Sequence, residues 1–313
     1  MPDIVISEFM DEKAVRQGLV GFDTLYDPSL VDKPDELSRA LSEARALIVR
    51  NRTQVRGALL QSGPNLQAIG RLGVGLDNID VEACRTRGIA VFPASGANDD
   101  SVAEYVIATA MVLLRSAYTS TPDVVRGSWP RTRAVGREIA GKQLGLVGFG
   151  AIAKETARRA AALGMTVAAY DPHVPADHPS WNQPWGRVTS QALPELLAAS
   201  DVISLHVPLT AETRNLIGAE ALETTRRDAI LINAARGGVV DEGAVVAALT
   251  AGRLGGAALD VFDEEPLSAA RGGTFAGCPN LILTPHIAGV TVESNERVSW
   301  ATVKSVAAHL RRL

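Results

Sequence analysis

Short apolar runs with strong β propensity alternate with helix-sized segments along almost the whole chain, and this alternation restricts the fold more than any other feature. The runs lie at residues 4–6, 46–49, 89–92, 144–147, 166–170, 202–205, 229–232, 257–259 and 281–283. Continuous apolar strands separated by helices are typical of parallel sheets that are covered on both faces. The sequence therefore predicts an α/β protein with doubly wound parallel sheets.

Three of the segments between these runs are predicted to be helical. Residues 152–163 and 242–249 are rich in alanine, which favours helix by propensity. Residues 102–114 are almost wholly apolar, but 13 residues are too few to span a bilayer, so we expect a buried helix. Residues 121–137, with Arg and Gly, and 172–184, with Pro, His and Trp, are predicted to be loops.

Composition narrows the classes of function. A chain of 313 residues is long enough for two domains. Its 31 basic and 35 acidic residues give a net charge of -4, which offers no general attraction to nucleic acid or to a membrane surface. Cys84 and Cys278 lack metal-type spacing, and the N-terminus lacks a signal-peptide pattern, so we expect no metal site and a cytoplasmic location.

A glycine-rich turn follows the apolar run at 144–147. In Gly148-Phe149-Gly150-Ala151-Ile152-Ala153, the first glycine permits a tight turn and the second lets the backbone approach a pyrophosphate. Ala153 is small enough for close packing of helix on strand, and the helix N-terminal amides would face the phosphates. The alternative is a tight strand-to-helix turn without a ligand.

Asp171 follows the next apolar run at the separation expected for the residue that accepts hydrogen bonds from an adenosine ribose. A carboxylate repels a 2′-phosphate, and no arginine stands beside it, so NAD is favoured over NADP. The alternative is an aspartate that only forms the turn at the end of a strand.

Arg236, Glu265 and His286 lie in loops after or near predicted strands, where open α/β sheets place their ligands. A guanidinium binds a carboxylate through two parallel hydrogen bonds. Each residue also has a plain structural interpretation: a solvated arginine, an acidic turn and a core histidine. Spacing alone does not decide between these interpretations.

Seven segments, in order, resemble the D-isomer-specific 2-hydroxyacid dehydrogenase family. They are RLGVGLDNID at 71–80, SVAE at 101–104, GFGAIA at 148–153, HVPLT at 206–210, NAARGGVVDE at 233–242, DVFDEEP at 260–266 and TPHIAG at 284–289. The resemblance extends over essentially the whole chain. It implies an NAD-dependent oxidoreductase that acts on the CH–OH group of a 2-hydroxy acid.

The resemblance also implies roles for the three polar residues. His286 would take the hydroxyl proton while a hydride leaves C2 for the nicotinamide, and would return the proton in the reverse direction. Glu265 would orient the imidazole and stabilise its protonated form. Arg236 would bind the substrate carboxylate and polarise the C2 oxygen.

Further contacts are implied at matching positions. Substrate contacts would come from Arg50, Asn51, Val74, Gly75, Arg236 and His286. Cofactor contacts would come from Val74, Gly148, Gly150, Ala151, Ile152, Asp171, His206, Val207, Pro208, Ala234, Ala235, Arg236, Asp260, His286 and Gly289. The chain departs from the family at Asn51, Ala151 and Ala153, and these departures do not threaten the activity. It also has Ser95 where a proline is common, and this difference has no functional explanation.

The family fold implies two domains and a homodimer. A flavodoxin-like substrate domain of residues 1–97 and 287–313 would surround an inserted Rossmann NAD-binding domain of residues 98–286.

Arg50 and Arg52 bear on the substrate. Because they alternate at the end of the run at 46–49, we expect their side chains to share a face and to meet a second anionic group. This favours a small anionic acid such as 3-phosphoglycerate, hydroxypyruvate, glyoxylate or 3-sulfolactate. The alternatives are a pair of surface arginines and, for the whole protein, an NADH-sensing corepressor that binds partner peptides without turnover.

Overall fold

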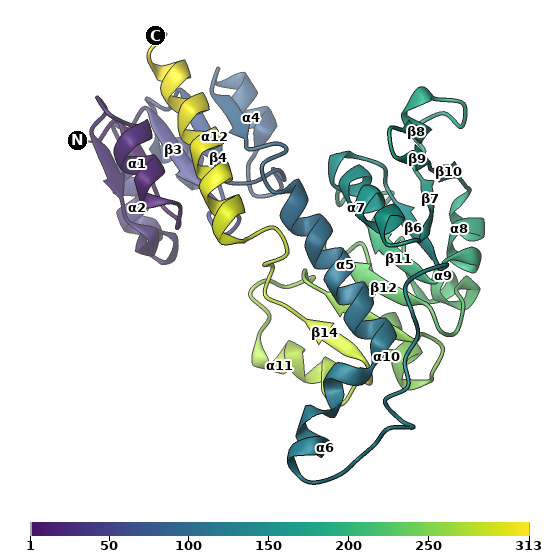
Figure 1. The fold of residues 1–313 in the computed structure, drawn as a ribbon. Helices are drawn as coiled ribbons and strands as arrows, with labels where there is room; N and C mark the ends of the chain where they lie inside the picture. The colour runs from purple at the N-terminus through teal and green to yellow at the C-terminus, as the bar shows by residue number, and fades with distance from the viewer. Residues whose placement is uncertain (1, 313) are drawn as a thin grey trace. The chain divides into compact units, whose positions relative to one another are not determined.

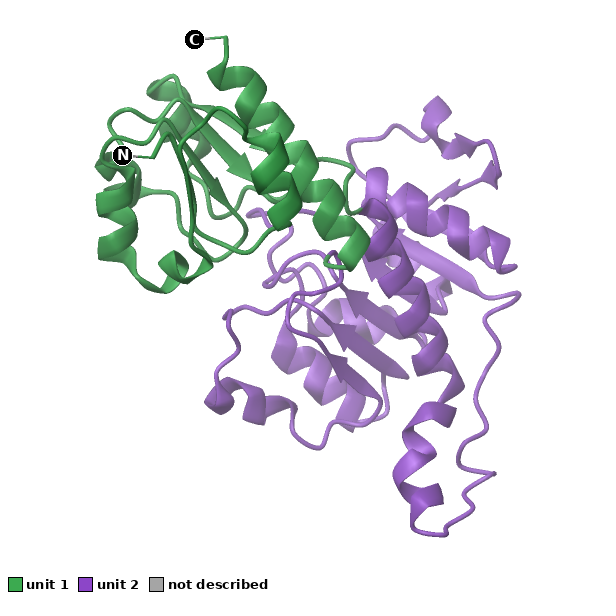
Figure 2. Ribbon diagram, turned by 60° about the vertical axis from the view of Figure 1, so that its left-hand side comes forward, with its two compact units in different colours: residues 1–98, 290–313 green, residues 99–289 purple. Residues whose placement is uncertain are grey.

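Two compact units make up the protein. The computed structural model describes residues 2–312. One unit holds residues 1–98 together with 290–313, and the other holds residues 99–289 (Figure 2). The C-terminal segment therefore belongs to the same unit as the N-terminus.

The first unit is built on a five-stranded sheet whose paired strands all run parallel. Its order is β2-β1-β3-β4-β5, which is the flavodoxin-like order. The strands are β1 (Ile4–Ile6), β2 (Thr24–Tyr26), β3 (Ala46–Val49), β4 (Ala68–Arg71) and β5 (Ala90–Pro93). The strand order reverses between β1 and β3, so the loops after these strands flank the position where such sheets bind ligands.

Helices cover both faces of this sheet because alternate strand residues point to opposite sides. Ile4, Ile6 and Ile48 share a core with α1 (Glu12–Gly18) and α12 (Val292–Leu310). Val5 and Leu47 share the opposite core with residues of η1 (Pro28–Asp32), α2 (Pro34–Leu41), α3 (Gly57–Ser62) and α4 (Val81–Thr86).

The second unit contains a seven-stranded parallel sheet in the order β10-β7-β6-β11-β12-β13-β14. Counted along the chain this is 3-2-1-4-5-6 with a seventh strand added, which is the Rossmann order. The strands are β6 (Gln143–Val147), β7 (Thr166–Tyr170), β10 (Thr189–Ser190), β11 (Val202–Leu205), β12 (Ile230–Asn233), β13 (Gly256–Leu259) and β14 (Leu281–Leu283). The order reverses between β6 and β11.

Two helical layers cover this sheet (Figure 1). The first contains α5 (Asp99–Arg115) and α7 (Ala151–Ala162), which share one core. The second contains α8 (Leu193–Ala199), α9 (Ala219–Thr224) and α10 (Glu242–Thr250), which share another. Shorter pieces are η2 (Ala117–Ser120), α6 (Thr121–Val125), η3 (Pro179–Trp181), the hairpin of β8 (Asn182–Gln183) and β9 (Gly186–Arg187), α11 (Ala269–Gly272) and η4 (Gly273–Phe275).

The predicted fold class is confirmed, with local corrections. All nine predicted runs contain a strand, and the buried helix expected at 102–114 is α5. The prediction that 121–137 is a loop throughout is wrong, because α6 starts this segment with a proline in its first turn. Residues 172–184 are likewise not a loop throughout, because they contain η3 and β8. Strands β2, β4, β8, β9 and β10 were not predicted. Among residues 2–312 no helix is both long and apolar enough to cross a membrane.

Candidate active site

The turn between β6 and α7 lies where the strand order of the second sheet reverses. Gly148 has a φ of +93°, and its N–H donates to the Tyr170 carbonyl at 2.7 Å. A Cβ on Gly148 would lie 2.6 Å from the His206 carbonyl oxygen, in the loop that follows β11. Only glycine therefore fits this turn, both for its backbone conformation and for the space available.

Gly150 leaves space at the start of α7. It occupies the N-cap position, no side chain caps the helix, and a Cβ on Gly150 would meet nothing within 4 Å. The first amides of a helix lack intrahelical acceptors and favour an anion. Ala151 and Ile152 carry two of these amides, and the fully buried Ala153 lets the helix pack closely. The turn thus fits the pyrophosphate of a dinucleotide.

Asp171 stands beside this turn, directly after β7. One carboxylate oxygen accepts the Phe149 N–H at 2.9 Å, and the other accepts the His173 N–H at 2.9 Å. The carboxylate is therefore oriented by two backbone amides at the edge of the glycine turn. It retains the acceptor capacity that a ribose hydroxyl requires.

His206 follows β11 on the other side of the point where the strand order reverses. Its Nε2 lies 3.0 Å from the Ser204 hydroxyl. Burial lowers the pKa of His206 to about 4, so the ring is neutral near pH 7. Val207 Cγ1 would lie 3.0 Å from a Cβ on Gly148, which places His206 and Val207 against the glycine turn, and Pro208 is the next residue.

Glu265 and His286 form a hydrogen-bonded pair. His286 Nδ1 lies 2.7 Å from Glu265 Oε2, and the two side chains are 31% and 29% exposed. Burial raises the pKa of Glu265, but the hydrogen bond and charge of His286, the Phe262 amide and the charge of Arg236 outweigh it, so the pKa lies below its ordinary value. The pair therefore presents an imidazole held by an ionised carboxylate.

Arg236 lies in the turn after β12, and this turn contacts the loop that carries Glu265. The Asn233 side chain accepts the Ala235 N–H at 3.1 Å and donates to the Arg236 carbonyl at 2.9 Å. A Cβ on Gly237 would lie 1.8 Å from the Phe262 carbonyl oxygen, so this turn touches the loop that carries Glu265. The three predicted catalytic residues are thus electrostatically coupled within one unit.

Asp260 directly follows β13 and is only 1% exposed. Its carboxylate accepts the N–H groups of Ile287 at 2.8 Å and Ala288 at 2.9 Å. Asp260, a predicted cofactor contact, therefore binds the backbone of the two residues that follow His286. Gly289, another predicted contact, comes directly after them. Ala234, the remaining predicted residue of this unit, lies in the turn after β12.

The predicted substrate residues of the first unit follow β3 and β4 at one edge of its sheet. Arg50 and Asn51 follow β3, and Val74 and Gly75 follow β4. The loop after β3 is folded around Glu8, whose carboxylate accepts the N–H groups of Arg50, Arg52 and Thr53 at 2.9, 3.1 and 3.0 Å.

The expectation that Arg50 and Arg52 share a face is wrong. The Arg50 guanidinium lies 4.0 Å over the Phe9 ring and donates to Asn295 Oδ1 at 2.5 Å. Arg52 instead pairs with Asp32 of η1 on the surface. Because β3 ends at Val49 and the chain then bends around Glu8, the alternation of an extended strand does not continue to these residues.

Comparison with known proteins decides the family. Residues 107–288 match the D-isomer specific 2-hydroxyacid dehydrogenase, NAD binding domain. The chain belongs to the D-isomer specific 2-hydroxyacid dehydrogenase family. It is 54% identical to (S)-sulfolactate dehydrogenase of Chromohalobacter salexigens, over 98% of this chain and 97% of that protein. It is 37% identical to hydroxypyruvate reductase of Thermotoga maritima, over 94% of each.

A solved structure supports the same family assignment. D-lactate dehydrogenase from Aquifex aeolicus, complexed with NAD and lactic acid, superposes with a TM-score of 0.83 at 29% identity, over 99% of this chain and 96% of that chain. This 2-hydroxyacid dehydrogenase is therefore an oxidoreductase that acts on CH–OH groups, with NAD as its cofactor, as the sequence predicts.

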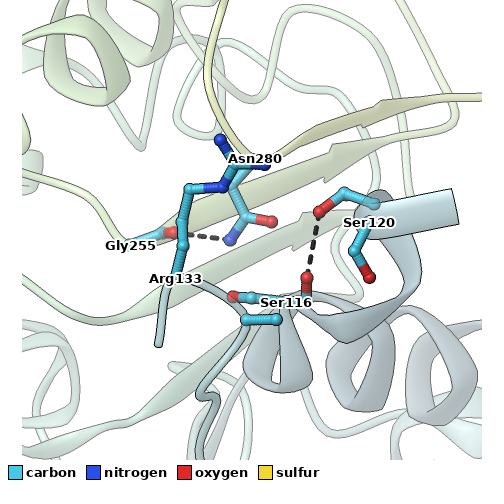
Figure 3. Close-up of a pocket in the computed structure, with 7 residues that line it drawn as sticks. Ser116, Ser120, Arg133, Gly255 and Asn280 are labelled. Carbon is cyan, nitrogen blue, oxygen red and sulfur yellow. Dashed lines mark hydrogen bonds between the residues drawn. The ribbon is translucent and has the colours of Figure 1, made fainter. Parts of the chain in front are cut away.

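A cavity of about 370 Å³ in this dehydrogenase lies away from these residues. Gly255 and Asn280 line it just before β13 and β14, with Ser116, Ser120 and Arg133 around them (Figure 3). Glu265 and His286 come after the opposite, carboxyl ends of the same two strands. The cavity therefore does not belong to the edge of the sheet that carries the candidate catalytic residues.

Sequence reasoning missed several residues that shape the site. Glu8, Asn233 and Thr284 were not predicted, although each orients a loop that carries predicted residues. Their common signal is a polar residue at or shortly after the carboxyl end of a strand, where its side chain reaches a neighbouring loop.

Proposed function

We propose that the protein interconverts a small anionic 2-hydroxy acid and its 2-oxo acid, with His286 and Glu265 as the acid/base pair. The observation that carries the proposal is the 2.7 Å contact between His286 Nδ1 and Glu265 Oε2. A carboxylate on Nδ1 orients the ring so that Nε2 is the nitrogen proposed to exchange a proton with substrate. The pair lies in the unit that has the Rossmann strand order.

Each catalytic residue has one role in this proposal. In oxidation, His286 Nε2 takes the proton of the C2 hydroxyl, and in reduction it returns a proton to the C2 oxygen. Glu265 holds the ring in that orientation and stabilises the imidazolium. Arg236 binds the substrate carboxylate, and its positive charge stabilises negative charge on the C2 oxygen.

The cofactor site in the proposal is the glycine turn and the loops around it. NAD, when bound, accepts or supplies the hydride of C2. The pyrophosphate is held by amides of the α7 N-terminus, and the adenosine ribose by Asp171. The remaining contacts come from the loops that carry Val74, His206, Val207, Pro208, Ala234, Ala235, Asp260 and Gly289.

The first unit is the proposed substrate domain. In this proposal the amides of Val74 and Gly75 bind the substrate carboxylate, and Arg50 and Asn51 contact the other end of the substrate. We propose a doubly anionic substrate, with the sulfonated acid 3-sulfolactate foremost, since the relative at 54% identity is named a sulfolactate dehydrogenase. Burial lowers the pKa of Arg50 to about 10, which still leaves a positive charge near pH 7. The protein is proposed to act in the cytoplasm, which agrees with its free thiols at Cys84 and Cys278.

The test is NADH-coupled turnover of sulfopyruvate, phosphohydroxypyruvate, hydroxypyruvate, glyoxylate and pyruvate. We expect Arg50→Gln to raise KM for the doubly anionic acids by about 10-fold or more, the value of one charge-assisted hydrogen bond, and to spare glyoxylate. Arg52→Gln is the matched control, because Arg52 pairs with Asp32. An equal loss with glyoxylate contradicts the role of Arg50. Tight NADH binding without turnover of any acid contradicts the function and favours a corepressor.

A further inference from the structure

The backbone at His286 is held in an unusual conformation by one residue. His286 has a φ of +53°, in the left-handed region that residues other than glycine rarely adopt. Its N–H donates to the Asp260 carbonyl at 2.7 Å, and the next two N–H groups donate to the two Asp260 carboxylate oxygens at 2.8 and 2.9 Å. Three consecutive amides therefore converge on Asp260, and this convergence fixes the direction of the imidazole.

The Asp260 carboxylate is itself held by hydrogen bonds that lead through Thr284 to Tyr105. Thr284 Oγ1 donates to Asp260 Oδ1 at 2.6 Å, and Tyr105 Oη lies 2.7 Å from Thr284 Oγ1. A threonine hydroxyl has one proton, and Thr284 gives it to the carboxylate, so Tyr105 is the donor to Thr284. Burial raises the pKa of Tyr105 to about 12, so its hydroxyl keeps its proton throughout the working pH range.

We propose that Tyr105 and Thr284 are positioning residues for the proposed reaction, acting through Asp260 to hold the His286 backbone and thus its imidazole. The inference rests on the proposed function for its catalytic consequence. Tyr105 comes from α5, Asp260 follows β13 and Thr284 follows β14, so the chain of hydrogen bonds connects a helix to the catalytic loop inside one unit. Hydrogen bonds in such a chain polarise and strengthen one another.

The kinetic test compares Tyr105→Phe, Thr284→Val and the double variant. We expect each single variant to lower kcat by about 5-fold, the equivalent of one neutral hydrogen bond, with little change in the KM for NADH. Because both residues act through Asp260, the double variant is expected to be no slower than Thr284→Val. Thr284→Ser keeps the hydroxyl and restores the rate.

The control is Tyr118→Phe, which removes a hydroxyl from a tyrosine of the same unit that is 65% exposed. It should leave kcat unchanged. A purely structural role of Tyr105 would lower the melting temperature without changing kcat, and additive losses in the double variant would contradict a shared route through Asp260.

Amide hydrogen exchange tests the hydrogen-bond chain without turnover. Exchange at Ile287 and Ala288 should speed up about 5-fold or more in Tyr105→Phe and Thr284→Val, and not in Tyr118→Phe. Unchanged exchange overturns the inference whatever the kinetics show. If the wild-type protein turns over none of the acids, the proposed function fails, and exchange at these two amides still decides whether Tyr105 and Thr284 hold the loop.

Discussion

Glu265 uses its two carboxylate oxygens for different partners, and this division separates its proposed catalytic role from its structural one. Oε1 accepts the Phe262 N–H at 3.0 Å, and Oε2 contacts His286 Nδ1. Glu265→Gln retains the shape and one acceptor but removes the charge that stabilises an imidazolium. We expect kcat to fall by about 100-fold or more, the usual worth of general acid–base catalysis, while the Kd for NADH stays within about 2-fold.

Steady-state kinetics and fluorescence titration with NADH measure the two quantities. Glu264→Gln is the matched control, because this neighbouring side chain is 55% exposed and forms a surface ion pair with Arg271 at 3.9 Å. A loss of similar size in Glu264→Gln, or a loss below about 10-fold in Glu265→Gln, contradicts the catalytic assignment.

His206 makes the stability of the protein depend on pH. Burial lowers its pKa from 6.5 to about 4, so between these values the unfolded chain binds a proton that the folded protein does not. Stability is therefore lost as pH falls through this window. The full difference corresponds to about 3 kcal/mol, and we expect about 2 kcal/mol because the residue is partly exposed.

Urea unfolding at pH 7 and pH 4.5 measures this loss. His206→Gln should flatten the profile, and the exposed His173→Gln should not. A wild-type stability that is unchanged between the two pH values contradicts the prediction.

At the scale of the element, the β6–α7 turn contains two glycines with different requirements. Gly148→Ala must adopt a φ of +93° and place its Cβ 2.6 Å from the His206 carbonyl oxygen, so we expect a loss of about 2 kcal/mol or more in unfolding free energy. Gly150→Ala meets nothing within 4 Å at a φ of -77°, so stability should change by less than about 1 kcal/mol.

The two variants should differ in cofactor binding as well. In the proposed cofactor site, the methyl added by Gly150→Ala would stand where the pyrophosphate approaches the backbone, so we expect the Kd for NADH to rise about 10-fold or more in a protein that remains fully folded. Calorimetry with NADH, together with thermal unfolding, separates the two effects. Unchanged NADH affinity in folded Gly150→Ala contradicts the proposed cofactor site.

The strands that sequence reasoning found and missed differ in how their residues are buried. Central strands such as β11 and β12 are mostly apolar and fully buried, so their sequence alone predicts them. The edge strand β2 exposes its central Leu25, and its short run resembles a loop. In β4, a Cβ on Gly70 would lie 2.6 Å from Thr302 of α12, so the glycine is required by a helix that comes more than 200 residues later. A local pattern cannot show that requirement.

The candidate site likewise contains residues that the sequence predicts and partners that it does not. Strand-end loops and family motifs predicted three candidate catalytic residues, and in the structure His286 and the charge of Arg236 both act on Glu265. The partners of Arg50 and Arg52 could not be predicted, because Asn295 and Asp32 are far from them in sequence and only the folded sheet brings them near.

At the scale of the whole molecule, the segment after α5 carries an unusual amount of exposed apolar surface. Val125, Trp129 and Val135 are 82%, 75% and 76% exposed, and Figure 1 shows α6 and the loop after it extending away from the seven-stranded sheet. Large exposed apolar side chains on one segment mark a surface that another protein covers. We propose that a second copy of the chain covers this segment in a homodimer.

Replacing an apolar side chain of this segment with a charge should separate the dimer. Burying a tryptophan side chain is worth about 2–3 kcal/mol, so Trp129→Glu should raise the dimer dissociation constant by about 100-fold or more. Val292→Asp is the matched control, because Val292 is 85% exposed at the start of α12 in the other unit. Sedimentation equilibrium should give twice the 33.0 kDa chain mass for the wild type and for Val292→Asp, and the single mass for Trp129→Glu. A monomeric wild type, or a Trp129→Glu protein as dimeric as the control, places the interface elsewhere or excludes it.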